Sequence, residues 1–557
     1  MTSVVAAGGI SVTMRGAVVD QGAAALERLV SDGVPARLAS GASGLWGPDA
    51  APAAARGMGW LELPRRSRAL PARLAGLAGE ARGAGLDRVV LAGTGGGVLA
   101  PEVITRAAGV EPVLLDGTDP HQIGAVVGDA RLPRTLLVVT AGPDGVPAET
   151  DAHLRIFEDA FRRAGISGAD LRRRFLVVAP EGSPAAALAA EAGYRLVPAE
   201  PDVPPRFGAL GAYGLVPSAL AGADVARLLD EAAALAPTLG QPYDNPALAL
   251  GAALGASAQA GRGKLVIAGH GAGLAGLGDW LEHLVSESTG KDGKGLLPVV
   301  VESVDAPGFA PAADTCRVLL GDGSGEPGQG GRDADVTVTG PLGAHFLLWE
   351  YATAVACRVI GVDPFARPDV AESDDNAAAL LRAEEGASPT VVGRPALVSG
   401  AVEVHGPEKL LKGARTLTSA LEAIVAAVPE RGYLAVSAYL DRWGDPDAGG
   451  LRSLLADRAA AGRRRAVPVT FGWGSRALRS TGQYHKGGPG NGAFLQLTGE
   501  VVADVPVPGR PYTLGHLQLA QAFGDLRVLR SRGCPAVRLH LRDRVDGLAQ
   551  LTKALTS

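Results

Sequence analysis

The chain has 557 residues, of which 47% are hydrophobic and 20% are charged, and its formal net charge is -5. The length predicts roughly three or four domains, and the slight negative charge gives no reason to expect a nucleic acid or an anionic membrane as a partner. No apolar stretch reaches the roughly 18 to 20 residues of a membrane span, and the N-terminus lacks a signal-peptide pattern. Since the three cysteines share no metal-like spacing, we expect a cytoplasmic protein.

A repeating pattern of strands and helices begins after residues 1–60, which are expected to form an N-terminal helical segment. Continuous apolar strands that alternate with amphipathic helices indicate a parallel sheet buried on both faces, with ligands bound at the carboxyl ends of the strands. The predicted strands of the first unit are Arg88–Ala92, Pro112–Leu115, Thr135–Val139 and Arg174–Val178, and its predicted helices are Pro101–Ala108, Thr150–Ala164 and Pro184–Ala192.

The same pattern recurs in a second unit, which ends with a long apolar helix at Leu342–Ile360, and again in a C-terminal unit. We therefore expect domains at residues 61–235, 236–400 and 401–557. The predicted strands are Lys264–Ala268, Leu296–Val301, Arg317–Leu320 and Val336–Val338 in the second unit, and Leu434–Tyr439, Val467–Phe471, Phe494–Leu497 and Ala536–Leu541 in the third.

The segment with the clearest chemistry is Glu287–Gly295, which follows a predicted helix at Gly278–Val285. A carboxylate in a turn rich in Ser, Thr, Gly and Lys is well placed to act as a general base, while Lys291 and Lys294 offer positive charge to an anionic substrate. The alternative interpretation of Glu287 is a solvated carboxylate at a helix end.

Six segments carry recognisable motifs: Leu91–Val103, Glu149–Asp151, Arg206–Pro217, Glu287–Gly295, Gly361–Phe365 and Ser480–Gly488. In order and spacing they resemble the glucose-6-phosphate isomerase family, and the last resembles the C-terminal signature of its long actinobacterial form. The resemblance implies an α/β fold with two SIS-type (sugar-isomerase) doubly wound parallel-sheet domains plus a C-terminal α/β extension. It also implies a homodimer that interconverts glucose-6-phosphate and fructose-6-phosphate in glycolysis and gluconeogenesis. We find no P-loop, dinucleotide or metal-ligand pattern, so no cofactor or metal is expected.

In that family a glutamate moves a proton between C1 and C2 of the sugar, an arginine stabilises the enediolate, and a histidine and a lysine assist ring opening. The resemblance implies that Glu287 is the base and Arg206 the enediolate arginine, with His485 and Lys486 available for ring opening. The implied substrate-binding residues are Gly95, Gly96, Gly97, Asp144, Gly145, Thr150 and Gln483.

The loop that holds the phosphate in the family is changed here. Where the family has a Ser-Lys-Ser-Gly-Ser/Thr-Thr type run, residues 142–147 read Gly-Pro-Asp-Gly-Val-Pro, without a hydroxyl group. The two prolines have no N–H to donate, and Asp144 brings negative charge towards a dianion. Losing several donors at about 1 kcal/mol each weakens binding by orders of magnitude, so a tight turn is expected in place of a phosphate site.

Two residue pairs and two single residues also differ from the family pattern. Gly97–Val98 stands where a Ser-Ser pair is usual, and Pro204–Pro205 stands where two glycines are usual. The position of the family lysine falls on Asp374, which reverses its charge, and Arg479 stands where related sequences tend to have histidine.

Three hypotheses about function remain open at this stage. The chain is an isomerase of this family with reduced or redirected activity, or a non-catalytic paralogue that acts as a carbohydrate-derivative-binding or partner subunit. The third is an isomerase of a less anionic sugar, in which Asp144 binds a hydroxyl or an amine. The expected ligand is a sugar phosphate or a related small sugar.

Overall fold

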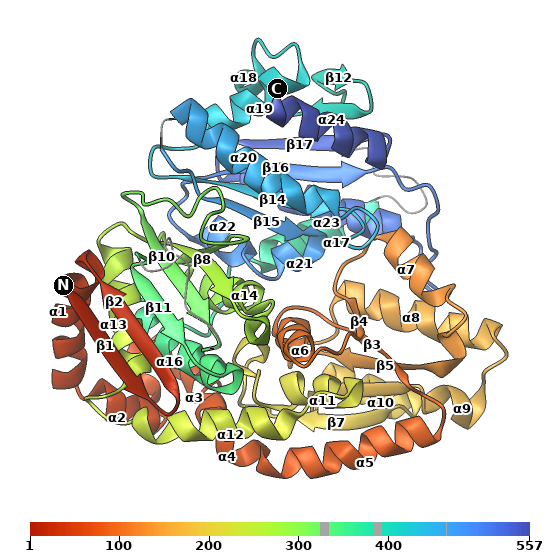
Figure 1. Cartoon of the computed structure of the whole chain (residues 1–557). Helices are drawn as coiled ribbons and strands as arrows, with labels where there is room; N and C mark the ends of the chain where they lie inside the picture. Colours follow the sequence, from red (N-terminus) through yellow and green to blue (C-terminus); the bar gives the residue numbers. More distant parts are fainter. Residues whose placement is uncertain (324–332, 384–392, 464) are drawn as a thin grey trace.

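The computed structural model describes the chain except for residues 324–332, 384–392 and 464. Its three sheets form three α/β lobes around α6 (Gly96–Ala107) and α14 (Leu277–Thr289), which lie near the centre of the molecule in Figure 1. This architecture confirms the predicted fold class of two doubly wound units and a C-terminal α/β unit. Within the described residues, no helix combines the length and apolar character needed to cross a membrane.

The first lobe contains a five-stranded sheet in which every strand is parallel to its neighbours, in the order β4-β3-β5-β6-β7. Its three central strands are buried along their full length, because continuous apolar runs fit only between two layers of helices. The strands are β3 (Arg88–Ala92), β4 (Val113–Leu115), β5 (Thr135–Thr140), β6 (Phe175–Pro180) and β7 (Arg195–Ala199), and the helices are α5 (Leu70–Gly83), α6, α7 (Pro120–Val127), α8 (Ala148–Arg163), α9 (Gly168–Arg172), α10 (Pro184–Ala192) and α11 (Ala212–Ala221).

The second lobe contains a six-stranded sheet, ordered β1-β2-β11-β10-β8-β9, which includes an antiparallel hairpin from the N-terminus. The expectation of a helical segment over residues 1–60 missed this hairpin. Its second strand alternates between buried and half-buried residues, and Gly8 and Gly9 form the turn with positive φ angles, which is a hairpin pattern. The strands are β1 (Thr2–Ala7), β2 (Ile10–Arg15), β8 (Lys264–His270), β9 (Leu297–Val300), β10 (Thr315–Gly321) and β11 (Val336–Thr339), and the helices are α1 (Ala17–Ser31), α2 (Val34–Ala39), α12 (Val225–Leu235), α13 (Pro246–Gln259), α14 and α16 (Leu342–Ile360).

The third lobe contains a six-stranded sheet in the order β12-β13-β17-β16-β14-β15, whose last four strands are parallel. The pair β12 and β13 adds to it in antiparallel fashion. The strands are β12 (Leu397–Ser399), β13 (Val402–His405), β14 (Tyr433–Tyr439), β15 (Val469–Trp473), β16 (Gly492–Gly499) and β17 (Ala536–Leu541), and the helices are α17 (Ala371–Ala383), α18 (Glu408–Leu411), α19 (Leu417–Ala426), α20 (Asp447–Arg463), α21 (Gly474–Leu478), α22 (Gly482–Gly487), α23 (Leu514–Ser531) and α24 (Arg544–Thr556).

Helix α6 starts one turn earlier than its sequence predicts and contains Pro101. The sequence placed the helix start at that proline because proline favours the first turn. Pro101 has no N–H for the carbonyl group of Gly97, but the hydroxyl group of Thr140 on β5 donates a hydrogen bond of 3.2 Å to that oxygen. The neighbouring strand thus satisfies the carbonyl group that the proline leaves free, and the glycine loop becomes the first turn of the helix.

Helix α14 extends to Thr289, so Glu287 lies in its last turn and not in the turn that follows it. The hydroxyl group of Thr289 donates to the carbonyl oxygen of Val285 at 2.7 Å and accepts from the backbone N–H of Leu296 at 2.8 Å. This side chain closes the helix and fixes the start of the next strand. The carboxylate of Glu287 is therefore held by a rigid helix.

Candidate active site

The end of α14 presents two titratable side chains on one face, because residues four apart on a helix are neighbours. These are His283 and Glu287, whose side chains are 4% and 5% exposed. Carboxylate oxygens of Glu287 lie 3.4 Å from His283 Nδ1, 3.8 Å from Arg206 Nη1 and 3.3 Å from Arg367 Nη1. We call these four residues the Glu287 centre.

The charge state of this centre is set by burial and by its cations. Burial raises the pKa of Glu287, but its electrostatic interactions with His283 and with the cations Arg206 and Arg367 outweigh burial and hold the pKa at about 2. Burial lowers the pKa of His283 more than Glu287 raises it. Both ring nitrogens of His283 are buried without a hydrogen-bond partner among the described residues. Glu287 is thus a stable anion next to a neutral imidazole.

Arg206 is held in place largely by the backbone. Its Nη2 donates to the carbonyl oxygens of Pro364 and Phe365, both at 2.7 Å, and its Nε donates to the hydroxyl group of Ser288 at 3.2 Å. The side chain is 4% exposed. Arg206 therefore faces Glu287, as the resemblance implies, but most of its donors already have partners.

Arg367 joins the altered loop at residues 142–147 to the centre. Its Nη2 donates to the carboxylate of Asp144 at 2.8 Å, while its Nη1 lies 3.3 Å from Glu287. Asp144 is 76% exposed and Arg367 is 47% exposed. The structure thus places Asp144, Arg206 and Glu287 around one point, with Arg367 as the link.

The glycine loop supports the centre through close packing. A Cβ atom on Gly95, which caps α6 with φ of 55°, would lie 2.9 Å from Cε1 of His283. A Cβ atom on Gly97 would lie 2.6 Å from the hydroxyl group of Thr140. Gly145, with φ of 131°, has open space around it. Gly95 and Gly97 therefore let the helix approach its neighbours, whereas Gly145 allows a turn that other residues rarely adopt.

Replacing Gly96 by alanine is expected to destabilise the fold by about 1–3 kcal/mol and to displace Arg206. The added Cβ atom would lie 2.2 Å from the carbonyl oxygen of Pro205 and 2.7 Å from the backbone nitrogen of Arg206. Urea unfolding measures the loss, with Gly79→Ala as the control, because Gly79 in α5 has no neighbour within 4 Å and helical Gly→Ala changes are neutral or stabilising. Equal stability of the two variants would contradict the close contact.

The two charge-altered positions form a second ionic cluster. Arg479 Nη1 lies 2.5 Å from Asp374, and its Nε lies 3.2 Å from Glu149, which is fully buried. Gln521 donates a further hydrogen bond of 3.3 Å to Glu149. Thr150, in the first turn of α8, is buried, and its hydroxyl group has no partner among the described residues. The residues that replace the family lysine and histidine are therefore paired with each other.

Gln483 has a structural role in the described contacts. Its side-chain nitrogen donates to the carbonyl oxygen of Gly290 at 2.9 Å and to the carboxylate of Asp369 at 2.6 Å. Its side-chain oxygen accepts from the backbone N–H of Asp369 at 3.0 Å. The residue ties α22 to the end of α14.

His485 and Lys486 lie on the short helix α22. His485 Nδ1 is 2.8 Å from the hydroxyl group of Tyr433, and Lys486 Nζ is 2.6 Å from Asp525. Burial, followed by the charge of Lys486, lowers the pKa of His485 to about 3. Over the described part of the chain, no hydrogen bond or ion pair joins either residue to the Glu287 centre.

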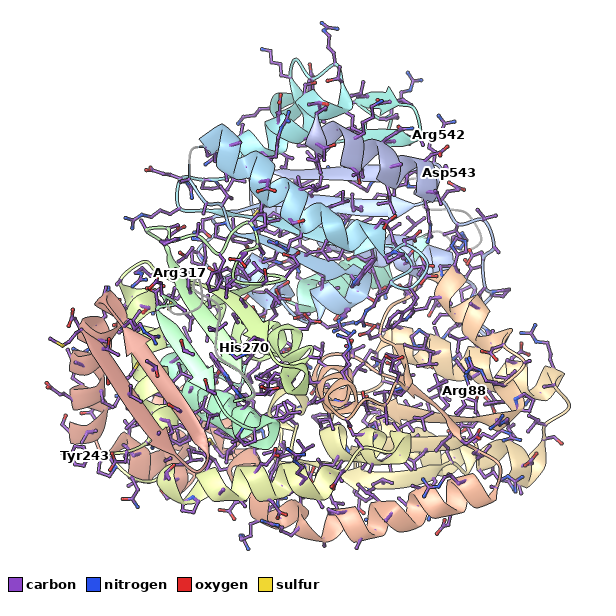
Figure 2. The ribbon with its side chains drawn as sticks, viewed as in Figure 1. Arg88, Tyr243, His270, Arg317, Arg542 and Asp543 are labelled. Atoms are coloured by element: carbon purple, nitrogen blue, oxygen red, sulfur yellow. The ribbon has the colours of Figure 1, made fainter. Side chains whose placement is uncertain are left out.

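His270, which Figure 2 labels, is the last residue of β8, an inner strand of the second sheet. A Cβ atom on Gly321 would lie 2.5 Å from its Nε2, so the ring packs over β10.

Two residues of the centre were not singled out from the sequence. His283 lies four residues before Glu287, a spacing that places it on the same helix face, whereas nothing local in the sequence indicates that Arg367 reaches Glu287.

No protein-family model matches the chain. A probable glucose-6-phosphate isomerase from Haloarcula marismortui is 35% identical over 219 residues, which cover 38% of this chain and 49% of the relative. A glucose-6-phosphate isomerase from Rubrobacter xylanophilus is 30% identical over 255 residues, which cover 43% of this chain and 58% of the relative. The chain thus spans about half the length of the curated relatives it matches.

Solved structures are similar in fold. A glucose-6-phosphate isomerase from Chlamydia trachomatis superposes with a TM-score of 0.54 at 16% identity, covering 68% of this chain and 90% of that one. At such identities the likeness concerns the fold alone.

Proposed function

We propose that this chain, which belongs to the glucose-6-phosphate isomerase family, binds a sugar at the Glu287 centre and isomerises sugar phosphates at a strongly reduced rate. The observation that carries the proposal is the ionic chain from Asp144 through Arg367 to Glu287, with separations of 2.8 Å and 3.3 Å. These paired charges occupy the region that a dianionic substrate would need.

The strength of the base supports a reduced rate. A general base works best when its pKa lies near the working pH, because it must both be ionised and accept a proton readily. Glu287 is ionised, but its pKa of about 2 makes it a reluctant proton acceptor. The neutral ring of His283, 3.4 Å away, is the remaining group at the centre that exchanges protons readily.

The ring-opening residues support the same conclusion. Burial lowers the pKa of Arg479, but Glu149 and Asp374 raise it more, so its pKa lies above the ordinary value for arginine. A guanidinium group in this state does not give up a proton. Arg479 can orient a hydroxyl group, but it cannot act as the acid that a histidine would be.

A coupled assay that converts fructose-6-phosphate to glucose-6-phosphate tests the proposal. We expect turnover orders of magnitude below that of an authentic isomerase assayed in parallel, and loss of the remaining activity in Glu287→Gln. Glu158→Gln, a half-buried change on α8 outside the Glu287 centre, is the matched control and should leave the rate unchanged. Turnover equal to the authentic enzyme would refute the proposal, and an unchanged rate in Glu287→Gln would remove Glu287 as the base.

The second candidate is a non-catalytic subunit, and the extensive backbone hydrogen bonding of Arg206 favours it. Absence of turnover, no thermal shift with glucose-6-phosphate and co-purification of another subunit would support this candidate. If unphosphorylated or amino sugars raise the melting temperature instead, Asp144 binds a hydroxyl or amine in an isomerase of a less anionic sugar. Sedimentation would show whether the chain forms the homodimer that the family resemblance implies.

A further inference from the structure

Lys291, just after the end of α14, is a buried lysine to which the proposed reaction gives no role. It is 2% exposed, so it does not present to a substrate the positive charge that the sequence suggested. Its Nζ instead donates hydrogen bonds to the backbone carbonyl oxygens of Asp363 and Ala366. Among the described residues it has no ion-pair partner, so carbonyl groups of the backbone hold its charge.

These two carbonyl groups begin and end a run of four, at residues 363–366. Arg206 Nη2 donates to the two carbonyl oxygens between them, both at 2.7 Å. Two cations therefore bind four consecutive carbonyl groups, of which Lys291 takes the outer pair. The segment is bent by a side-chain turn in which the backbone N–H of Phe365 donates to the carboxylate of Asp363 at 2.7 Å.

The position of this segment explains why cations gather there. It follows the C-terminal end of α16, where the helix dipole and the free carbonyl groups favour positive charge. Lys294, which is exposed, lies at the same end, with its Nζ 3.4 Å from the carbonyl oxygen of Gly361. Burial lowers the pKa of Lys291 to about 8, so at neutral pH its amine is mainly the ammonium form with three donors. A buried charge is costly unless it is hydrogen-bonded.

The segment leads directly into Arg367, whose Nη1 lies 3.3 Å from Glu287. On the other side of Arg367, the side chain of Gln483 joins Asp369 to the carbonyl oxygen of Gly290. Arg367 thus lies between two connections to the end of α14. Lys291 and Arg367 are both cations and cannot bond to each other. Apart from their mutual repulsion, any influence of one on the other passes through the backbone of residues 363–366.

We propose that Lys291 is a positioning residue of the Glu287 centre, which holds Arg367 against Glu287 by binding the first and last carbonyl groups of residues 363–366. Without Lys291 the segment loses two of its four donors, and the ionic chain from Asp144 through Arg367 to Glu287 loosens at its middle member. The role rests on the proposed function, because that chain is what sets the proposed base.

A double-mutant cycle in urea unfolding tests the role. Lys291→Met keeps most of the side-chain length and removes every donor, and Arg367→Gln removes the cation that faces Glu287. We expect the loss of stability caused by Arg367→Gln to fall to about half or less in the Lys291→Met background, because Arg367 no longer faces the carboxylate there. Two residues with independent structural roles would instead give additive losses.

Two further variants show that the hydrogen bonds are responsible. Lys294→Met, at the exposed neighbouring lysine, should leave the loss caused by Arg367→Gln unchanged. Lys291→Arg keeps the cation and its donors, so it should restore most of that loss. If Lys291→Met does not fold, Lys291→Gln, which keeps two donors on a shorter side chain, takes its place in the cycle, with an intermediate loss expected.

Three outcomes would overturn the proposal. The first is an additive cycle for Lys291, equal to that for Lys294. The second is a larger loss from Arg367→Gln in the Lys291→Met background, which repulsion between the two cations alone would produce. The third is a loss in Lys291→Arg as small as that in Lys291→Met. Because the cycle measures stability and not turnover, its failure is distinguishable from failure of the isomerase assay.

Discussion

Replacing Arg479 by methionine is expected to lower the free energy of unfolding by about 3–5 kcal/mol. Arg479 is the cation that faces Glu149 and Asp374, and Glu149 is fully buried. Methionine keeps much of the side-chain volume but leaves an uncompensated carboxylate in the interior. The hydrogen bond of 3.3 Å from Gln521 is the remaining polar contact of Glu149 with a side chain in the described structure, and it cannot replace a full charge.

The measurement is urea unfolding followed by tryptophan fluorescence. Arg162→Met is the control, because Arg162 pairs with Glu158 on the exposed side of the same helix that carries Glu149. Exposed pairs of this kind contribute about 0–1 kcal/mol. The double variant Arg479→Met/Glu149→Gln should recover part of the loss, because the buried charge is gone. A single variant as stable as the control would show that Glu149 is hydrated or protonated.

Most central strands of the three sheets were predictable because their signal is local, whereas β1, β2, β7, β12 and β13 were not predicted. The predicted strands at Arg88–Ala92 and Ala536–Leu541 begin and end where the structure has β3 and β17. The same holds for Leu342–Ile360, which is apolar on all sides and is buried as α16. In such segments the local sequence indicates burial, so periodicity and composition are sufficient to predict the secondary structure.

Where the prediction failed, a distant residue decides the structure. Helix α6 begins before Pro101 because the hydroxyl group of Thr140, on β5, donates a hydrogen bond to the carbonyl oxygen of Gly97, which the proline leaves without a donor. The N-terminal hairpin was not predicted, although β2 alternates between buried and half-buried residues, because the helical pattern of α1 follows it directly.

In the candidate site, too, the sequence indicated the altered residues but not the tertiary contacts between them. The sequence indicated that Asp374 and Arg479 depart from the family pattern, but they are 105 residues apart and their ion pair is a tertiary contact. Asp144 and Arg367 are 223 residues apart. Charge reversal at a single position suggests a lost function, whereas the structure shows that each new charge has an opposite partner. The altered residues thus form a self-consistent set of ion pairs.

Replacing Asp144 by serine is expected to strengthen the binding of glucose-6-phosphate at least tenfold. A phosphate dianion about 5 Å from a carboxylate is repelled by roughly 1.7 kcal/mol at the dielectric constant of water, which corresponds to a factor of more than ten in affinity. The change also frees Nη2 of Arg367, now 2.8 Å from Asp144, and it returns a hydroxyl donor to the loop. Equilibrium titration with glucose-6-phosphate measures the gain.

Two further variants separate the contributions. Asp159→Ser removes an exposed carboxylate that pairs with Arg163 on α8, and it should leave the affinity unchanged. Asp144→Ser/Arg367→Gln keeps the relief of repulsion but removes the freed cation, so its affinity should fall between those of the wild type and the single variant. If Asp144→Ser binds the sugar phosphate no better than the wild type, the loop at residues 142–147 does not face the phosphate group, and the ion pair with Arg367 would then be structural. A stepwise gain would instead identify Asp144 as the residue that directs this pocket away from dianionic sugars.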